Sequence, residues 1–351
     1  MSSRILFALA TLLAATQAVG AERLVNNLPN MEDLHPTPDN RWVIGSAMRA
    51  AGRGGALYAI AVDGSTATTL YPSEAPSPTA TTQCPDGAPA AADFAPHGIS
   101  LETDRERHTL FVVNHGGRET VEIFALTPGS EGEPPRLRWR DCIPLPAGSQ
   151  ANSVTPGRDG TVYVTAAGAP FPIDSPPAGA TAPAPIPGSG VLAWRPGDGW
   201  RILTTGLALS NGLVISRDNS VLYVAEWLGR QVAEIDAEDG TILRRVAVDF
   251  GVDNLRLDDK GGLWLAGQAA STDAVMACYL SERRDCGLDS ALARVDTTAL
   301  AVDCAQHLPA TPGFSSATVA LPLGDRVWLG TFRGDAVGIA GRGATPGKCI
   351  D

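Results

Sequence analysis

The chain has 351 residues and a formal net charge of −11 at pH 7. Nucleic acids and anionic membranes repel so acidic a protein, so we expect neither as a partner. A small molecule or a cation suits this charge better. Glycine (38) and proline (27) are abundant, and short β-rich segments recur along the whole length. This profile is typical of a closed all-β fold, which can hold a long chain in one domain.

The first 21 residues have the pattern of a secretory signal peptide. Arg4 precedes a short apolar run from Ile5 to Ala15, and small residues then lead to Ala21. The run is shorter than the roughly 20 residues that a membrane-spanning helix needs, so we expect cleavage and no stable membrane anchor. Residues 22–351 would then form an exported protein, periplasmic or extracellular.

One type of short strand recurs through the rest of the chain. Each copy has an aromatic residue between aliphatic or small ones, and turn signals such as Asp159-Gly160 and Asp218-Asn219 precede most copies. The spacing suits propeller blades of about 40–50 residues with insertions, and a β-sandwich does not explain it. Six copies therefore predict a six-bladed β-propeller with four-stranded blades; they are Arg41–Gly45, Leu110–Val113, Val162–Thr165, Leu222–Ala225, Leu263–Ala266 and Val327–Gly330.

Two segments between these strands are rich in Ala, Pro, Ser and Thr, namely residues 73–96 and 166–187. They contain little that a core could bury, so we interpret both as loop insertions on the surface. Either could lie over one face of the propeller as a lid.

Six cysteines in an exported chain predict up to three disulfides. Cys278 and Cys286 are close enough in sequence to close one loop. A bond from Cys349 to Cys304 would anchor the C-terminus, which leaves Cys84 with Cys142, although the sequence alone does not choose among the possible pairings. The CxxC spacing of a zinc or redox site is absent from the sequence.

A polar cluster lies shortly before each of the six aromatic strands. In a propeller the strand at this position lines the central channel, so equivalent positions in six blades converge on the axis. Asn211-Gly212 or Asp253-Asn254 alone would be ordinary turn residues, but turn chemistry does not explain the shared register. The clusters are Glu32-Asp33, His97-Gly98, Asn152-Ser153, Asn211-Gly212, Asp253-Asn254 and Ser315-Ser316.

The side chains in this register favour a calcium site on the axis. Carboxylate and amide oxygens are the ligands that calcium prefers, whereas zinc would need more histidine or cysteine. We therefore predict one calcium ion with a coordination position open to water or substrate. A calcium ion that only stiffens the channel is the alternative. The predicted ligands are Glu32, Asn152, Asn211, Asp253 and Asn254.

Two histidines belong to the same region of the expected fold. His97 occupies the register position of its blade, and His115 directly follows the aromatic strand of that blade. Neighbouring antiparallel strands place both imidazoles at one end of the channel. A histidine pair beside a cation indicates proton transfer near neutral pH.

The same motifs resemble the paraoxonase (arylesterase/lactonase) family and, more distantly, the gluconolactonase and senescence-marker-protein group. The resemblance rests on Pro96–Ser100, Val112–His115, Ser210–Ser216, Tyr223–Glu226, Val252–Asn254, Ser315–Ala320 and Leu329–Thr331. It implies two calcium ions in the tunnel of a six-bladed propeller. The catalytic ion would have the five ligands named above, and a buried structural ion would use Asp33 and the backbone of Ile99. It also implies that His97 and His115 form a dyad that helps to activate water.

The chain departs from the paraoxonase pattern at two positions. Ser153 stands where the family has an acidic ligand, which counts against the second calcium. Gln268 stands near the position where the family has a further histidine.

These observations predict a calcium-dependent hydrolase of small-molecule esters or lactones. Calcium would polarise the substrate carbonyl, Asn152 and Asn211 would orient its oxygen, and a base would activate water. That base would be His115 tuned by His97, or the carboxylate of Glu32 or Asp253. The Gly-x-Ser-x-Gly motif of a serine acyl-enzyme is absent. The alternatives are a sugar-lactone hydrolase of the gluconolactonase type and a non-catalytic, calcium-stabilised ligand-binding propeller.

Overall fold

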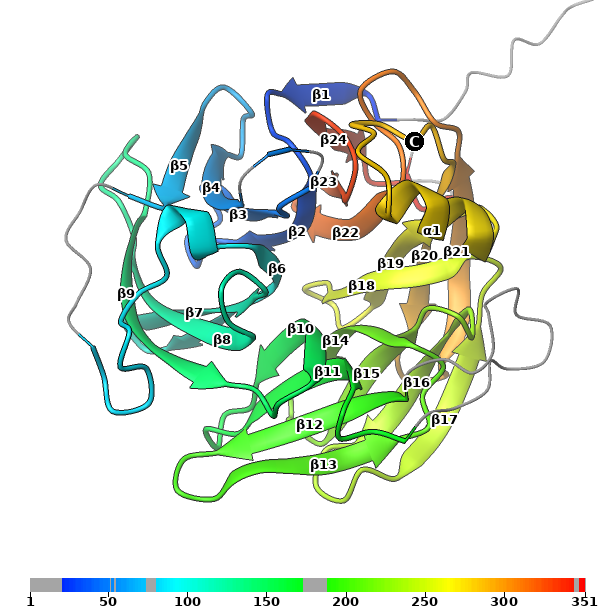
Figure 1. Ribbon diagram of the computed structural model, residues 1–351. Coiled ribbons are helices and arrows are strands. Elements are labelled where there is room, and N and C mark those ends of the chain that lie inside the picture. The colour runs from blue at the N-terminus through cyan, green and yellow to red at the C-terminus, as the bar shows by residue number, and fades with distance from the viewer. Residues whose placement is uncertain are drawn as a thin grey trace, which may run out of the picture.

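The computed structural model describes residues 21–50, 52–53, 55–73, 80–172, 188–343 and 347–350. These residues form 24 strands, arranged as six four-stranded antiparallel sheets around a central axis (Figure 1). The protein is a six-bladed β-propeller, as the repeated strand type predicts. The expected signal peptide lies outside the described residues except for Ala21.

The first five blades each consist of four consecutive strands, with the first strand nearest the axis (Figure 1). Blade one has β2 (Met31–Pro36), β3 (Trp42–Ala47), β4 (Ala56–Ala61) and β5 (Ala67–Tyr71). Blade two has β6 (Pro96–Asp104), β7 (Arg107–Asn114), β8 (Thr120–Thr127) and β9 (Arg136–Pro144). Blade three has β10 (Ser149–Pro156), β11 (Val162–Gly168), β12 (Ser189–Arg195) and β13 (Gly199–Thr205). Blade four has β14 (Ser210–Ile215), β15 (Val221–Glu226), β16 (Gln231–Asp236) and β17 (Ile242–Ala247). Blade five has β18 (Gly251–Leu257), β19 (Leu263–Gln268), β20 (Ser290–Asp296) and β21 (Ala301–Leu308).

The sixth blade closes the ring because it combines strands from the two ends of the chain. It has β22 (Ala317–Leu323), β23 (Arg326–Thr331), β24 (Ala336–Gly341) and, on its outer edge, β1 (Arg23–Asn26). Figure 1 shows blue β1 beside red β24, and the two strands pair antiparallel. This pairing covers the edge of β24 and holds the first and last blades together.

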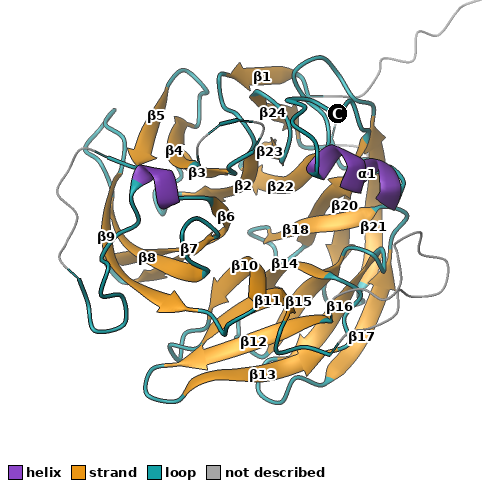
Figure 2. Ribbon diagram, in the orientation of Figure 1, coloured by secondary structure: helices purple, strands orange, loops and turns teal. Residues whose placement is uncertain are grey.

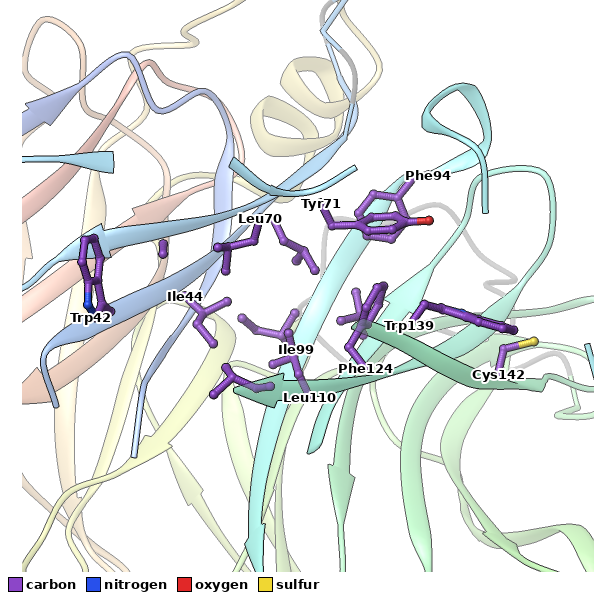
Figure 3. Close-up of a cluster of buried hydrophobic side chains, with 14 of the residues drawn as sticks. Trp42, Ile44, Leu70, Tyr71, Phe94, Ile99, Leu110, Phe124, Trp139 and Cys142 are labelled. Carbon is purple, nitrogen blue, oxygen red and sulfur yellow. The ribbon is translucent and has the colours of Figure 1, made fainter. Parts of the chain in front are cut away.

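The aromatic strands of the sequence are the second strand of each blade, which confirms the repeat. Their side chains pack between neighbouring blades: Trp264 and Trp328 are almost completely buried. Figure 3 shows one such cluster, in which Trp42 and Ile44 from blade one and Leu110 from blade two contribute to a shared core. Burial of these large apolar side chains holds the blades in a rigid ring, which fixes the inner strands relative to one another.

The two Ala/Pro-rich insertions differ in part from the expected surface loops. Ala166 is fully buried in β11, and Phe94, Cys84 and Phe171 are also buried. The overall composition does not predict these buried residues, because a few apolar side chains are enough to attach a long proline-rich segment to the core. Part of each insertion, residues 74–79 and 173–187, lies outside the described residues.

Two short helices, η1 (Ala91–Asp93) and α1 (Thr272–Tyr279), lie in front of the blades in Figure 2. Ser271 caps the start of α1, since its side chain accepts a hydrogen bond from the Ala274 backbone. Neither described helix has the length and apolar character needed to cross a membrane.

Three disulfides join the expected cysteine pairs: Cys84–Cys142, Cys278–Cys286 and Cys304–Cys349. The second closes the loop after α1, and the third ties the C-terminal segment to β21. Three disulfides indicate that the protein folds in an oxidising compartment, as exported proteins do.

Candidate functional site

Five of the six polar clusters lie on inner strands, and all six inner strands have a β-bulge. The strand register shifts between Met31 and Asp33 in β2, and equivalent shifts occur in β6, β10, β14, β18 and β22. A bulge adds one residue to a strand and redirects its side chains. In blade six the shift lies at Thr318, so Ser315-Ser316, the expected cluster, precedes the strand.

Two of the bulges need glycine because neighbouring inner strands approach closely there. A Cβ atom on Gly98 would lie 2.6 Å from the carbonyl oxygen of Asn152. A Cβ atom on Gly212 would lie 2.6 Å from the Asn254 Cα and 2.6 Å from the Asp253 carbonyl oxygen. The glycine that follows His97 and Asn211 therefore allows the next blade to bring its polar residues to the axis.

The redirected side chains meet at the bottom of one cavity of about 770 Å³. Its lining includes Glu32, His97, Asn152, Asn211 and Asp253, which come from five different blades. The structure thus brings these predicted residues together at one end of the tunnel.

The rim of the same cavity is formed in part by α1 and the residues after it. Met276, Tyr279 and Leu280 line the cavity and are exposed. Leu280 is 76% exposed, which is unusual for a large apolar side chain beside a pocket. The cavity is therefore polar at its base and apolar at part of its rim.

Buried oxygen atoms of three cavity-lining residues, and of Asn254 beside Glu32, lack hydrogen-bond partners within the described residues. They are Glu32 Oε2, Asn152 Oδ1, Asn211 Oδ1 and Asn254 Oδ1. Leaving a buried polar atom unsatisfied costs about 1–3 kcal/mol, so four such oxygens in and beside one cavity point to a positively charged partner. Three amides and the two carboxylates of Glu32 and Asp253 form an all-oxygen set, which fits a calcium ion.

Burial shifts the pKa values of the two carboxyl groups at the base of the cavity. Burial raises the pKa of Glu32 well above its usual range, and the nearby Asp253 raises it further. Burial also raises the pKa of Asp253 to about 7, although a hydrogen bond from Gln268 opposes the shift. A divalent cation among these groups would favour the charged carboxylates instead.

His97 and His115 form a hydrogen-bonded pair that continues to Glu119, a residue that sequence reasoning missed. The distance from His97 Nδ1 to His115 Nε2 is 2.8 Å, and His115 Nδ1 lies 3.0 Å from both carboxylate oxygens of Glu119. At the other end, His97 Nε2 lies 3.6 Å from Glu32 Oε1 and 3.5 Å from Asn152 Nδ2. Burial and the neighbouring His115 lower the pKa of His97 to about 3.

Asp33 and Ile99, the ligands implied for a second calcium, are bound to Arg256 instead. Arg256 forms a buried ion pair with Asp33 Oδ1, and its guanidinium also donates to the Ile99 carbonyl at 3.3 Å. The other carboxylate oxygen of Asp33 accepts the Ile99 backbone N–H at 2.8 Å. These residues do not fit a second calcium, because a guanidinium already supplies the positive charge.

Gln268 is a further residue whose place in the site was not expected. Its Nε2 donates to Asp253 Oδ2 at 2.8 Å, and its Oε1 accepts from Trp227 Nε1 at 2.8 Å. Gln268 therefore fixes the orientation of Asp253. Gln268 stands near the position where the paraoxonase family has a histidine, which indicated that it belongs to the site. The sequence did not indicate that it contacts Asp253.

Comparisons with known proteins connect this architecture to a family. The model of the SMP-30/gluconolactonase/LRE-like region matches residues 45–278. No curated protein sequence matches the chain. Similar solved structures include a luciferin-regenerating enzyme, with 12% identity, a TM-score of 0.55, and 93% of this chain and 95% of that chain covered.

Two further solved structures have the same fold. One is a gluconolactonase from Xanthomonas campestris, with 18% identity, a TM-score of 0.53, and 90% of this chain and 87% of that chain covered. The other is regucalcin, a calcium-binding protein from Agrobacterium tumefaciens, with 12% identity, a TM-score of 0.52 and 92% of both chains covered. The narrower resemblance to paraoxonases stays a prediction. The family match covers most of the propeller, and the chain belongs to the SMP-30/gluconolactonase/LRE-like family.

Proposed function

We propose that the protein is an exported, calcium-dependent hydrolase of esters or lactones. The observation that carries the proposal is the gathering of unpartnered buried oxygens from four blades in and beside one cavity, next to a histidine pair. Membership of a family that includes gluconolactonases supports lactone hydrolysis as the reaction class. The proposed calcium ligands are Glu32, Asn152, Asn211, Asp253 and Asn254.

When bound, calcium supplies positive charge that polarises a carbonyl group and favours the oxyanion formed during hydrolysis. The protein's own residues prepare the site for this chemistry. Asn254 Nδ2 donates to Glu32 Oε1 at 2.6 Å, and Thr318 Oγ1 donates to the Glu32 carbonyl at 2.6 Å. Both contacts fix Glu32, so its free oxygen keeps one direction. Asn152 and Asn211 line the cavity and would orient the substrate's carbonyl oxygen.

In the proposed mechanism His97, rather than His115, accepts a proton from water. His97 Nε2 lies 3.6 Å from Glu32 Oε1, whereas the Nε2 atom of His115 is bonded to His97 Nδ1. In the proposed step the water oxygen forms a bond to the carbonyl carbon, and the water proton moves to His97 Nε2. When the carbon–oxygen bond of the ester or lactone breaks, the same proton returns to the leaving oxygen. A lactone thus gives a hydroxy acid.

The family also supports a second candidate, hydrolysis of sugar lactones. The apolar rim formed by Met276, Tyr279 and Leu280 favours a substrate with an apolar substituent over a hydroxyl-rich sugar lactone. The two candidates therefore differ in the substrate that the rim accepts, and share the residues at the base.

A substrate panel tests the proposal. The mature protein is assayed with phenyl acetate, a γ-lactone, a δ-lactone and gluconolactone, with calcium and after chelation. We expect calcium-dependent hydrolysis of the apolar substrates. Hydrolysis of gluconolactone alone would favour the second candidate. A folded, calcium-loaded protein that hydrolyses none of the four would contradict both and favour a binding propeller.

A further inference from the structure

Glu119 ends the hydrogen-bond chain that begins at the base of the tunnel. We infer that Glu119 is a positioning residue: it fixes the tautomers of His115 and His97 so that His97 presents a lone pair at Nε2 to the cavity. The effect on proton transfer at His97 rests on the proposed function, whereas the assignment of the two tautomers is independent of it.

The carboxylate of Glu119 is held in place by donors on two sides. His115 Nδ1 lies 3.0 Å from each of its oxygens, and the backbone N–H of Ala151 donates to Oε1 at 2.7 Å. Ala151 is next to Asn152 on the inner strand β10. Glu119 itself lies in the short connection between β7 and β8, and Leu145 N–H donates to its main-chain carbonyl at 3.1 Å. Its carboxylate therefore has little freedom to leave His115.

The direction of each hydrogen bond follows from the carboxylate. An ionised carboxylate only accepts, so the atom facing it, His115 Nδ1, carries the hydrogen. In neutral His115 the other nitrogen, Nε2, is then an acceptor, and it faces His97 Nδ1 at 2.8 Å. His97 Nδ1 must carry the hydrogen of that bond, which leaves His97 Nε2 as the atom with the free lone pair.

His97 Nε2, at the cavity end of these hydrogen bonds, is the atom that the proposed reaction needs as a proton acceptor. His97 Nε2 is the ring atom within 3.5 Å of Asn152 Nδ2, a donor that suits a lone pair. Two histidines without the carboxylate have either tautomer available, and in the wrong one an N–H points into the cavity. Glu119 thus selects a proton acceptor at the tunnel base from outside it, as the carboxylates behind catalytic imidazoles do.

The test compares wild type with Glu119→Gln by ¹⁵N NMR of histidine-labelled, calcium-loaded mature protein at mildly alkaline pH. The His97→Gln and His115→Gln variants assign two of the five imidazoles. We expect both histidines to carry hydrogen on Nδ1 in wild type. In Glu119→Gln, whose amide can also donate, we expect the population of the Nε2–H form of His115 to rise.

Kinetics and matched variants separate positioning from a structural role. We expect Glu119→Gln to lower kcat for the best panel substrate about 10–100-fold with little change in KM. Glu119→Asp, which keeps the carboxylate, should recover part of the loss. Glu131→Gln, which alters an exposed glutamate of the same blade, should match wild type. Melting temperatures confirm that each variant is folded.

Unchanged tautomers in a folded Glu119→Gln protein would overturn the inference, as would Nε2–H tautomers in wild type. If wild type hydrolyses none of the panel, the proposed function fails and the NMR result alone decides the role of Glu119. A loss of melting temperature without a tautomer change would assign Glu119 to structure only.

Discussion

Asn254 and Glu32 are 222 residues apart in the sequence, yet Asn254 Nδ2 donates to Glu32 Oε1 at 2.6 Å across the tunnel. The bond joins the fifth blade to the first and leaves one oxygen of each side chain without a partner among the described residues. The two remaining oxygens are suited to bind the same cation. The first prediction tests this pair.

Replacing Glu32 by glutamine should have opposite effects with and without calcium. Loss of the ligand charge should weaken calcium binding by at least about 100-fold, since even supporting groups contribute 10–100-fold. In chelated protein, at a pH above the raised pKa of Glu32, the same change removes a buried charge and should raise the free energy of unfolding by about 1–3 kcal/mol. Calorimetric titration and denaturant unfolding measure the two effects. Unchanged calcium affinity would remove Glu32 from the ligand set.

The stability of the calcium-free protein should fall as pH rises. The pKa of Asp253 is raised to about 7 and that of Glu32 is also raised, while unfolded carboxyl groups titrate near pH 4. Between these values the folded state binds more protons than the unfolded state, so stability decreases with pH. Calcium replaces those protons, so the gap between loaded and chelated melting temperatures should widen from about pH 4 to pH 7. A chelated protein that gains stability across this window would contradict the electrostatic assignment.

Gln268→Ala should weaken calcium binding through Asp253. The variant removes the donor 2.8 Å from Asp253 Oδ2, so the carboxylate loses its fixed orientation, and we expect a loss of about 10–100-fold in calcium affinity. Gln150→Ala is the matched control, because Gln150 lines the same cavity and is exposed. Equal affinities for the two variants would show that Gln268 does not support the site.

Gly212→Ala should damage the site by separating two inner strands. The new Cβ atom would lie 2.6 Å from backbone atoms of Asp253 and Asn254, and backbone does not move aside as a flexible side chain can. Overpacking of this kind costs about 1–3 kcal/mol. Thermal unfolding and calcium titration should both show a loss, whereas wild-type values for both would mean that the strands have room.

Arg256→Met should destabilise the protein whether or not calcium is present. Removing one member of a buried ion pair leaves Asp33 uncompensated, which typically costs about 3–5 kcal/mol. The double variant with Asp33→Asn should recover part of this loss. If added calcium restored the stability of Arg256→Met, a cation could replace the guanidinium at Asp33.

The parts of the site that the sequence predicts are those that repeat with the blades. Glu32, Asn152 and Asn211 share one register on the inner strands of blades one, three and four. A shared register can be recognised from the sequence repeat alone. Burial of the aromatic second strands follows from the same periodicity.

The contacts that the sequence does not predict depend on details that no repeat encodes. Glu119 reaches His115 through the conformation of one short connection, and Arg256 reaches Asp33 across the tunnel. Gln268 contacts Asp253 because a bulge shifts the pairing of β18 and β19 between Val252 and Leu255. Only the contact between Arg256 and Asp33 joins two blades, the fifth and the first.

Initial hydrolysis rates, measured while free calcium is titrated into chelated mature protein, test the central claim most directly. Calcium binding to the same samples is followed in parallel by calorimetry. We expect the rate to rise in proportion to the occupancy of one calcium site per chain. In Asn211→Ala we expect the rate to fall to the uncatalysed background. A rate that stays the same after chelation, or a calcium-loaded protein without turnover on any panel substrate, would contradict calcium-dependent ester or lactone hydrolysis at this site.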